Sequence, residues 1–193
     1  MTVVSDVDAR VTDAALVCFG RYGIAKTTME DVARQAGISR ATLYRQVQSR
    51  EDLVHATIRA EARRITGLVE DATSGASTTP DLLAAVLHVF AAELAEHEVL
   101  NSLLETEPEQ IVARLSEDQP YVLEMIAALC GPPIRASIAA GELDRSDPDA
   151  TVDYVSRMLL LFAVERSSHV DLDTIEGCRD IVTHEMLTGW RAP

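Results

Sequence analysis

The chain has 193 residues, enough for one domain or for a small domain joined to a larger one. Hydrophobic residues make up 47% and aromatic residues 4%, so the core must be built from Ala, Leu, Val and Ile on helix faces. The longest apolar run, Met158–Val164, is far shorter than the roughly 20 residues needed to cross a bilayer, and the acidic start does not resemble a secretory signal. We therefore expect no membrane helix and a cytoplasmic location.

The net charge of -14 argues against nucleic-acid binding when the chain is taken as a whole. The charges are unevenly distributed, however. Residues 1–64 hold 10 Lys and Arg against 8 Asp and Glu, whereas residues 65–193 hold 7 against 23. Residues 21–50 contain six basic and two acidic side chains, so this window is locally basic, as a DNA-binding surface should be.

The residues that usually carry catalysis or bind metals form no recognisable pattern. Cys18, Cys130 and Cys178 are far apart and lie on apolar stretches, which is typical of reduced core residues. The pair His184-Glu185 lacks a second His at metal-binding spacing, and the chain has no phosphate-binding Gly-rich loop or nucleophile elbow. The prediction is no metal, no cofactor and no enzymatic activity.

Every predicted element is a helix, because no segment alternates apolar and polar residues for long enough to form a strand. The first helix begins at a capping-box pattern, Ser5 to Asp8, and ends at Gly23. The second opens with a capping box formed by Thr27 and Glu30.

The second helix ends at Gly37, and Ser39 caps a short third helix. A fourth, long helix begins at residues 49–52 and extends to about Ala72. A loop rich in Ser, Thr and Gly follows at Thr73–Pro80.

The second part of the chain contains further helices separated by Pro and Gly. An amphipathic helix carries residues 83–94, a shorter one covers residues 99–105, and Pro108 and Pro120 mark breaks. Gly131-Pro132-Pro133 must either kink or stop the next helix, and the sequence leaves both outcomes open. A helix beginning at residues 147–149 is apolar almost all round from Val152 to Val164. The last helix shares one face among Ile175, Cys178, Val182, Met186 and Trp190.

The second and third helices have the spacing of a helix-turn-helix. Ala33 is the small residue where the helices meet, Gly37 tolerates the left-handed turn, and Ile38, Leu43 and Val47 are the apolar residues that lock the pair together. A plain helical hairpin can produce the same pattern. The face of the third helix that points away from Leu43 and Val47 favours DNA binding.

That outward face carries side chains suited to reading DNA. Arg45 can bind guanine bidentately, Gln46 can pair with adenine, and Ala41 and the methyl group of Thr42 can meet a thymine methyl. Tyr44, together with Thr28 and Arg50, is better placed for phosphates. The predicted DNA-binding residues are Thr27, Thr28, Arg40, Ala41, Thr42, Tyr44, Arg45, Gln46 and Arg50.

The segment Thr27–Arg45, followed by Ser49-Arg50-Glu51-Asp52-Leu53, resembles the N-terminal signature of the TetR family of regulators, as does Phe19-x-x-Tyr22-Gly23. The resemblance covers about residues 8–55. Beyond them the chain is similar to the family only in layout, and Val47-Gln48 departs from the usual aromatic residue followed by a small residue or Pro. The resemblance implies an all-α fold with a helix-turn-helix domain at residues 1–50 and a helical effector-binding and dimerisation domain at residues 51–193.

The resemblance also implies a homodimer that binds double-stranded DNA at a near-palindromic operator, acting as a repressor released by a small lipophilic effector. The surrounding acidic residues leave a cationic effector possible. Candidate pocket residues are Leu87, Phe90, Leu94, Leu104, Met125, Ile126, Leu129 and Phe162, all of which also suit a core position. Candidate dimer-interface residues are Val155, Leu159, Phe162, Ile175, Cys178, Val182 and Met186.

Three other interpretations compete with this one. The helix at residues 152–164 can instead be the central core helix of a monomer. The chain can be a helical interaction protein that has lost DNA binding, although the run Arg40–Arg45 then has no evident structural purpose. Activation instead of repression also stays open, because the sign of regulation depends on where the operator lies.

Overall fold

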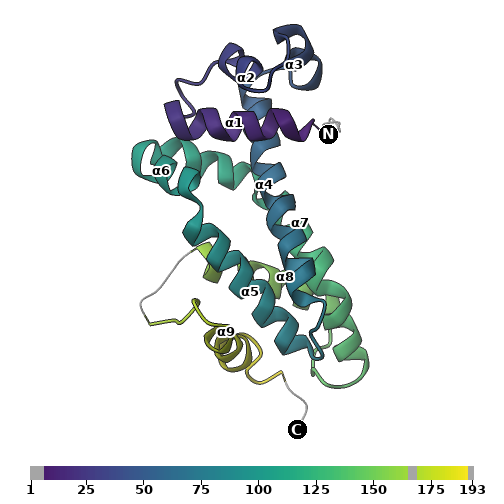
Figure 1. Cartoon of the computed structure of the whole chain (residues 1–193). Helices are drawn as coiled ribbons and strands as arrows, with labels where there is room; N and C mark the ends of the chain where they lie inside the picture. The colour runs from purple at the N-terminus through teal and green to yellow at the C-terminus, as the bar shows by residue number, and fades with distance from the viewer. Residues whose placement is uncertain (1–6, 165–168, 191–193) are drawn as a thin grey trace. The chain divides into compact units, whose positions relative to one another are not determined.

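The computed structural model describes residues 7–164 and 169–190, and every regular element within them is a helix (Figure 1). The predicted all-α class is confirmed. The α-helices are α1 (Ala9–Tyr22), α2 (Met29–Gln35), α3 (Arg40–Gln46), α4 (Arg50–Thr73), α5 (Thr79–Glu96), α6 (Glu98–Thr106), α7 (Pro108–Ala139), α8 (Pro148–Val164) and α9 (Ile175–Ile181), and α9 continues into a π-helical turn, η1 (Val182–Met186).

The helices pack as two compact units that do not follow chain order. One contains the residues up to Arg63 together with His97–Pro120, and the other contains Arg64–Glu96 and the residues from Tyr121 onward. Helix α6 and the start of α7 therefore pack with the N-terminal helices. The division into functional domains at residue 50 stays a prediction, because it concerns function and not packing.

The core of the first unit joins α1, α2, α3 and α6. Val11 and Phe19 of α1, Val32 of α2 and Leu43 of α3 are buried, and Leu103 brings α6 into the same cluster. Burying such side chains stabilises the fold by about 1.5–3 kcal/mol each. This shared core holds the short helices α2 and α3, which are too short to be stable alone.

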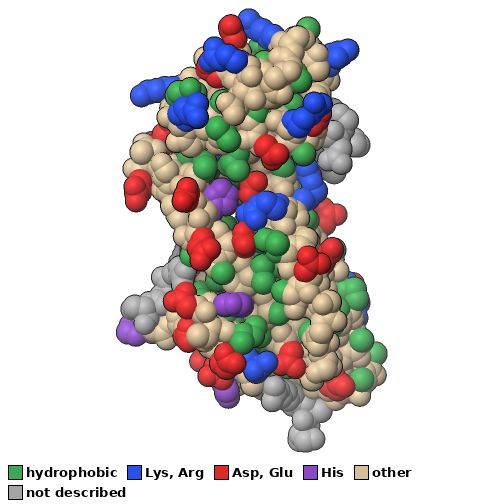
Figure 2. All heavy atoms as spheres, viewed as in Figure 1, with side chains coloured by type: hydrophobic (Ala, Val, Ile, Leu, Met, Phe, Trp, Pro, Cys, Tyr) green, Lys and Arg blue, Asp and Glu red, His purple; other side chains and the backbone are tan. Residues whose placement is uncertain are grey.

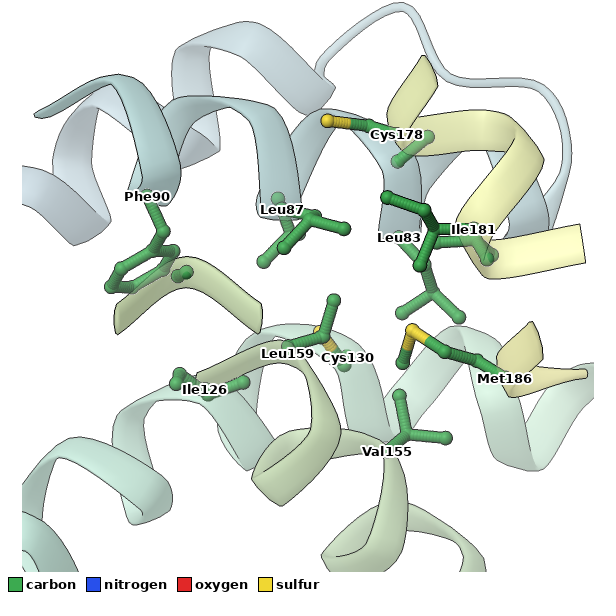
Figure 3. Close-up of a cluster of buried hydrophobic side chains, with 14 of the residues drawn as sticks. Leu83, Leu87, Phe90, Ile126, Cys130, Val155, Leu159, Cys178, Ile181 and Met186 are labelled. Atoms are coloured by element: carbon green, nitrogen blue, oxygen red, sulfur yellow. The ribbon is translucent and has the colours of Figure 1, made fainter. Parts of the chain in front are cut away.

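The core of the second unit is built around α5, which packs against both α8 and α9. Figure 3 shows Leu83, Leu87 and Phe90 of α5 directed toward side chains of α7, α8 and the C-terminal helices. The labelled partners are Ile126, Cys130, Val155, Leu159, Cys178, Ile181 and Met186. All three cysteines are buried and free, as predicted.

Two predicted helix starts are shifted in the structure. Helix α1 begins after Asp8, whose side chain accepts a hydrogen bond from the backbone N–H of Arg10, and Ser5 of the predicted capping box lies outside the described residues. The capping box of α2 is formed by Thr28 and Asp31, one residue later than predicted. The shift arises because adjacent threonines at positions 27 and 28 offer two registers with an acidic residue three positions on, and only tertiary packing selects between them.

The prolines of α7 do not end the helix. Pro108 occupies its first position, where a missing N–H costs nothing. Helix α7 then continues through Pro120 and through Gly131-Pro132-Pro133 to Ala139, so the predicted break at Pro120 is wrong and the helix does not stop at residues 131–133. Ile126, Cys130 and Ile134 are fully buried along this stretch. Their packing compensates for the N–H groups that proline lacks.

The C-terminal helix is shorter than predicted. Helix α9 ends at Ile181, and the π-helical turn that follows ends at Met186. Trp190 lies beyond both elements, where its ring packs against Tyr154 with centroids 5.2 Å apart and beneath the guanidinium of Arg145. The apolar periodicity therefore placed these residues on one buried side but overestimated the length of the helix.

Among the described residues, α7 alone is long and apolar enough to cross a membrane, judged by length and composition only. The sequence-based expectation of no membrane helix rested on uninterrupted apolar runs, whereas a window average tolerates single charged residues. The finding is weak evidence for a membrane span, because core helices of globular domains pass the same test.

Candidate DNA-binding surface

Helix α3 is held against α2 by the residues that the helix-turn-helix spacing predicted. Leu43 and Val47 are buried at 0% and 2% exposure, and Ala33 is buried where the helices meet. Gly37 has a φ of 67°, in the left-handed region, and the following Ile38 N–H donates to the carbonyl of Ala33. The turn and the buried face together fix which side of α3 points outward.

The outward side of α3 is polar and basic. Arg40, Ala41, Tyr44 and Arg45 are exposed, whereas Thr42 is half-buried. The guanidinium of Arg40 lies 5.4 Å from the centre of the Tyr44 ring, and its interaction with Tyr44 raises the pKa of Arg40. Figure 2 shows Lys and Arg side chains gathered over α1 to α3. The surface combines hydrogen-bond donors with positive charge.

The start of α3 is capped locally. The Ser39 hydroxyl accepts a hydrogen bond from the Thr42 N–H at 3.1 Å, and the two hydroxyls lie 2.9 Å apart. The Arg45 guanidinium donates to the Thr42 hydroxyl at 3.4 Å. Thr42 is therefore engaged within α3, which leaves its methyl group as the part suited to contact a base.

Thr28 and Arg50 flank α3 and are both exposed. Thr28 caps α2 reciprocally with Asp31: the hydrogen bonds from Thr28 and the charge of Arg34 lower the pKa of Asp31 and keep this carboxylate ionised. Arg50 donates to the carbonyl of Ala25 at 2.7 Å. Contact of these two side chains with phosphate groups stays a prediction.

Two predicted DNA contacts need correction. Thr27 is 1% exposed, and its hydroxyl donates to the carbonyls of Gly23 and Cys18, so its side chain stabilises the end of α1 and cannot reach DNA. Gln46 is half-buried, and its side-chain oxygen accepts a hydrogen bond from the Asp8 N–H at 2.9 Å. Gln46 therefore joins the end of α3 to the start of α1. The Gln46 contact reaches back to the start of α1, and the Thr27 hydroxyl bonds back across the α1–α2 loop, so helical periodicity alone revealed neither.

The predicted pocket residues do not all lie together. Leu87, Phe90 and Ile126 are buried in the core of the second unit, with Leu94, Leu129 and Phe162 half-buried against it, and Met125 is also half-buried. Leu104 belongs to α6 in the first unit and is 38% exposed, so it is removed from this set. The error arose because α6 follows α5 in the chain but packs on α1.

The predicted dimer-interface residues lie mostly on the inner face. Val155, Leu159, Cys178, Val182 and Met186 are at most 2% exposed within one chain, and Phe162 and Ile175 are half-buried against the same core. The five fully buried side chains therefore have almost no surface left for a partner to cover, whereas Phe162 and Ile175 keep part of theirs. The dimer interface itself stays a prediction.

The sequence analysis did not single out the apolar side chains of α8 that stay exposed. Tyr154 is 40%, Leu161 49% and Val164 58% exposed. Tyr154 and Leu161 are seven residues apart and so share one face of the helix. The available signal was that α8 has more apolar residues than one buried face requires. The described residues contain no cluster of three or more His, Cys, Asp and Glu that could hold a metal ion.

Residues 11–57 match the model of bacterial regulatory proteins of the tetR family. The HTH-type transcriptional regulator BetI of Agrobacterium fabrum is 35% identical over 79 residues, which cover 41% of this chain and 38% of that protein. The chain thus matches less than two fifths of that curated relative's length.

Solved structures share the fold over nearly the whole chain. The TetR family repressor AlkX from Dietzia sp., implicated in biodegradation of n-alkanes, has a TM-score of 0.66 at 19% identity and covers 94% of this chain and 97% of its own. The transcriptional regulator FadR from Bacillus subtilis, in complex with stearoyl-CoA, has a TM-score of 0.58 at 14% identity and covers 93% and 97%. Residues 11–57 are thus similar to the tetR family of bacterial regulatory proteins, and the chain as a whole shares the fold of these solved regulators.

Proposed function

We propose that the protein is a homodimeric transcriptional repressor that binds a near-palindromic operator and is released from it by a small lipophilic effector. The observation that carries this proposal is the outward face of α3. Arg40, Ala41, Tyr44 and Arg45 are exposed there on a helix whose opposite side is fully buried. Such side chains have no structural role that would require them, whereas each matches a group on DNA.

The side chains divide into two roles. Ala41 and Arg45 are exposed on the side of α3 opposite Leu43, and they would contact base edges in the major groove together with the half-buried Thr42. Thr28, Tyr44 and Arg50 lie at its margins and would bind phosphates, which sets the position of the helix without reading sequence. Arg40 stacks on Tyr44 and would neutralise a phosphate next to it.

Dimerisation is supported by the exposed apolar face of α8. Tyr154, Leu161 and Val164 would lose contact with water if a second copy packed its own α8 against them about a two-fold axis. Recognition helices about 34 Å apart would then meet successive major grooves, which is why the operator should be a near-palindrome.

The effector is proposed to be lipophilic because the second unit offers apolar side chains. Leu87, Phe90 and Ile126 are buried in the hydrophobic core of this unit, and Leu94 and Phe162 are partly buried against that core. The B. subtilis neighbour was solved with stearoyl-CoA, which supports an acyl or alkyl compound. An effector that lowers the affinity for DNA must itself bind less tightly to the DNA-bound protein. A soluble regulator of this kind would work in the cytoplasm and would need no enzymatic activity.

The test is selection of random duplex DNA on the purified protein, followed by titration of the selected sequence at two salt concentrations. We expect an inverted repeat whose binding weakens steeply with salt. The Arg45→Ala variant should lose about 1–3 kcal/mol on that sequence and discriminate less between bases, whereas Tyr44→Ala should weaken all duplexes alike.

The matched control is Arg135→Ala, which removes the same charge from an exposed Arg of the second unit and should bind the operator nearly as the wild type does. Undiminished binding by both α3 variants would refute the assignment of α3 as the reading helix. No enriched sequence at all would instead favour a helical interaction protein without DNA binding. A reporter gene placed under the selected operator then distinguishes repression from activation.

A further inference from the structure

The loop between α1 and α2 is clamped at one residue, Ala25, by two charged side chains, one from the start of α4 and one from the α6–α7 junction. The N–H of Ala25 donates to the Glu107 carboxylate at 3.2 Å, and the carbonyl of Ala25 accepts from the Arg50 guanidinium at 2.7 Å. Ala25 itself is exposed. The backbone N–H and carbonyl of an exposed loop residue would ordinarily bond to water, so the engagement of both groups of Ala25 by side chains distinguishes this loop from a passive connection.

Glu107 connects this loop to two further helices. Its backbone N–H ends α6 by donating to the carbonyl of Leu103, and its backbone carbonyl accepts from the N–H groups of Gln110 and Ile111 at the start of α7. The residue is half-buried. The backbone of Glu107 therefore forms the α6–α7 junction, and its side chain is free to hold the α1–α2 loop.

The contact is built into the packing of α6 on α1. A Cβ added at Gly20 would lie 2.9 Å from a methyl group of Val99, and Leu103 is buried in the core shared by these helices. A Cβ added at Gly23 would lie only 2.2 Å from a carboxylate oxygen of Glu107. The glycine at position 23 thus leaves the space that the carboxylate occupies.

We infer that Glu107 is a positioning residue for DNA binding: it holds the α1–α2 loop and thereby sets the entry of α2 and the place of Thr28. The chain passes from Ala25 through Lys26 and the buried Thr27 to Thr28, so the clamp lies three residues before the proposed phosphate contact. Any rearrangement of the α6–α7 junction would then reach the DNA-binding surface through Glu107. The inference rests on the proposed DNA-binding function.

The direction in which DNA affinity changes on removing Glu107 distinguishes loss of the clamp from loss of electrostatic repulsion. Removing an acidic side chain near a DNA-binding surface should strengthen binding or leave it unchanged, because the phosphates repel carboxylates. Loss of the clamp should weaken binding, since the loop must be ordered at the moment of association. Glu107→Gln removes the charge but keeps an oxygen that can accept from Ala25. Glu107→Ala removes both.

The experiment compares Glu107→Ala, Glu107→Gln and the control Glu109→Ala, which removes the same charge from an exposed residue two positions away. The first readout is affinity for the selected operator at fixed salt. The second is hydrogen exchange of the Ala25 amide in the protein without DNA, measured by NMR. Glu107→Ala should bind about three- to ten-fold more weakly, the value of one net hydrogen bond. Its Ala25 amide should exchange about ten-fold faster.

Glu107→Gln should stay close to the wild type in operator affinity and in exchange of the Ala25 amide. Glu109→Ala should also match the wild type in both. Equal exchange and equal affinity in Glu107→Ala and Glu109→Ala would overturn the inference. So would tighter DNA binding by Glu107→Ala, because electrostatics would then be the main effect. If the wild type bound no DNA, the proposed function would fail, while the exchange of the Ala25 amide would still decide whether the clamp exists.

Discussion

Replacing Asp118 tests how α4 is joined to the start of α7 within the first unit. Its side chain is 1% exposed, and its carboxylate lies 2.6 Å from His55 Nδ1 and accepts from Arg59 Nε at 2.8 Å. Both partners belong to α4. The carboxylate is thus a buried charge held between two groups of one neighbouring helix.

The expected loss in the free energy of unfolding follows from the burial of Asp118 and of its two partners. Breaking a fully buried ion pair costs about 3–5 kcal/mol, because the remaining charge is left without compensation. Here the His55 and Arg59 side chains are 26% and 35% exposed, so water can solvate them once the carboxylate is gone. We therefore expect Asp118→Ala to lower the free energy of unfolding by about 2–3 kcal/mol, which is below that range.

The assay is urea unfolding followed by far-ultraviolet circular dichroism, with the free energy extrapolated linearly to water. The control is Glu117→Gln: this neighbouring acid is 52% exposed and lies 3.3 Å from His55, so its loss should cost under about 1 kcal/mol. A loss below about 1 kcal/mol in Asp118→Ala would refute the reasoning, since the buried carboxylate would then add no more than a surface pair.

Further predictions concern backbone, thiols and assembly. Gly37→Ala should cost about 1–2 kcal/mol of unfolding free energy for its left-handed backbone, and Gly23→Ala should cost more in the same urea assay because its backbone, with φ 81° and ψ 162°, lies in a region that is essentially restricted to glycine. Equal losses would contradict this difference. Burial raises the pKa of the Cys130 thiol to about 12 and that of Cys178 to about 11, so a thiol reagent at pH 8 should label the folded protein far more slowly than the protein in denaturant. Rapid labelling of the folded protein would show that these thiols are accessible. Leu161→Glu should convert the proposed dimer to monomers by light scattering while leaving the helical content unchanged, and an unaltered dimer would exclude this face of α8.

The helix-turn-helix could be predicted because its determinants are local. The left-handed turn at Gly37 and the buried pair Leu43 and Val47 lie within one short segment, and a period of 3.6 residues then specifies which side chains of α3 point outward. Arg45 and Tyr44 follow from this geometry without knowledge of any other helix. The all-helical class follows equally from composition and the absence of alternating segments.

Tertiary packing decided the remaining features of the fold and of the candidate site. Thr27 and Thr28 are equivalent as capping residues by sequence, and only the carbonyls at the end of α1 select Thr27 for burial. The apolar surface of α8 does not reveal which face meets α5 and which stays exposed, because burial within one chain and between two chains requires the same residue types. Glu107 carries no local signal at all: its role depends on α6 folding back onto α1 across 82 positions of sequence separation. The sequence alone therefore determined the elements with a short-range cause, whereas contacts between distant segments became visible only when their positions in space were known.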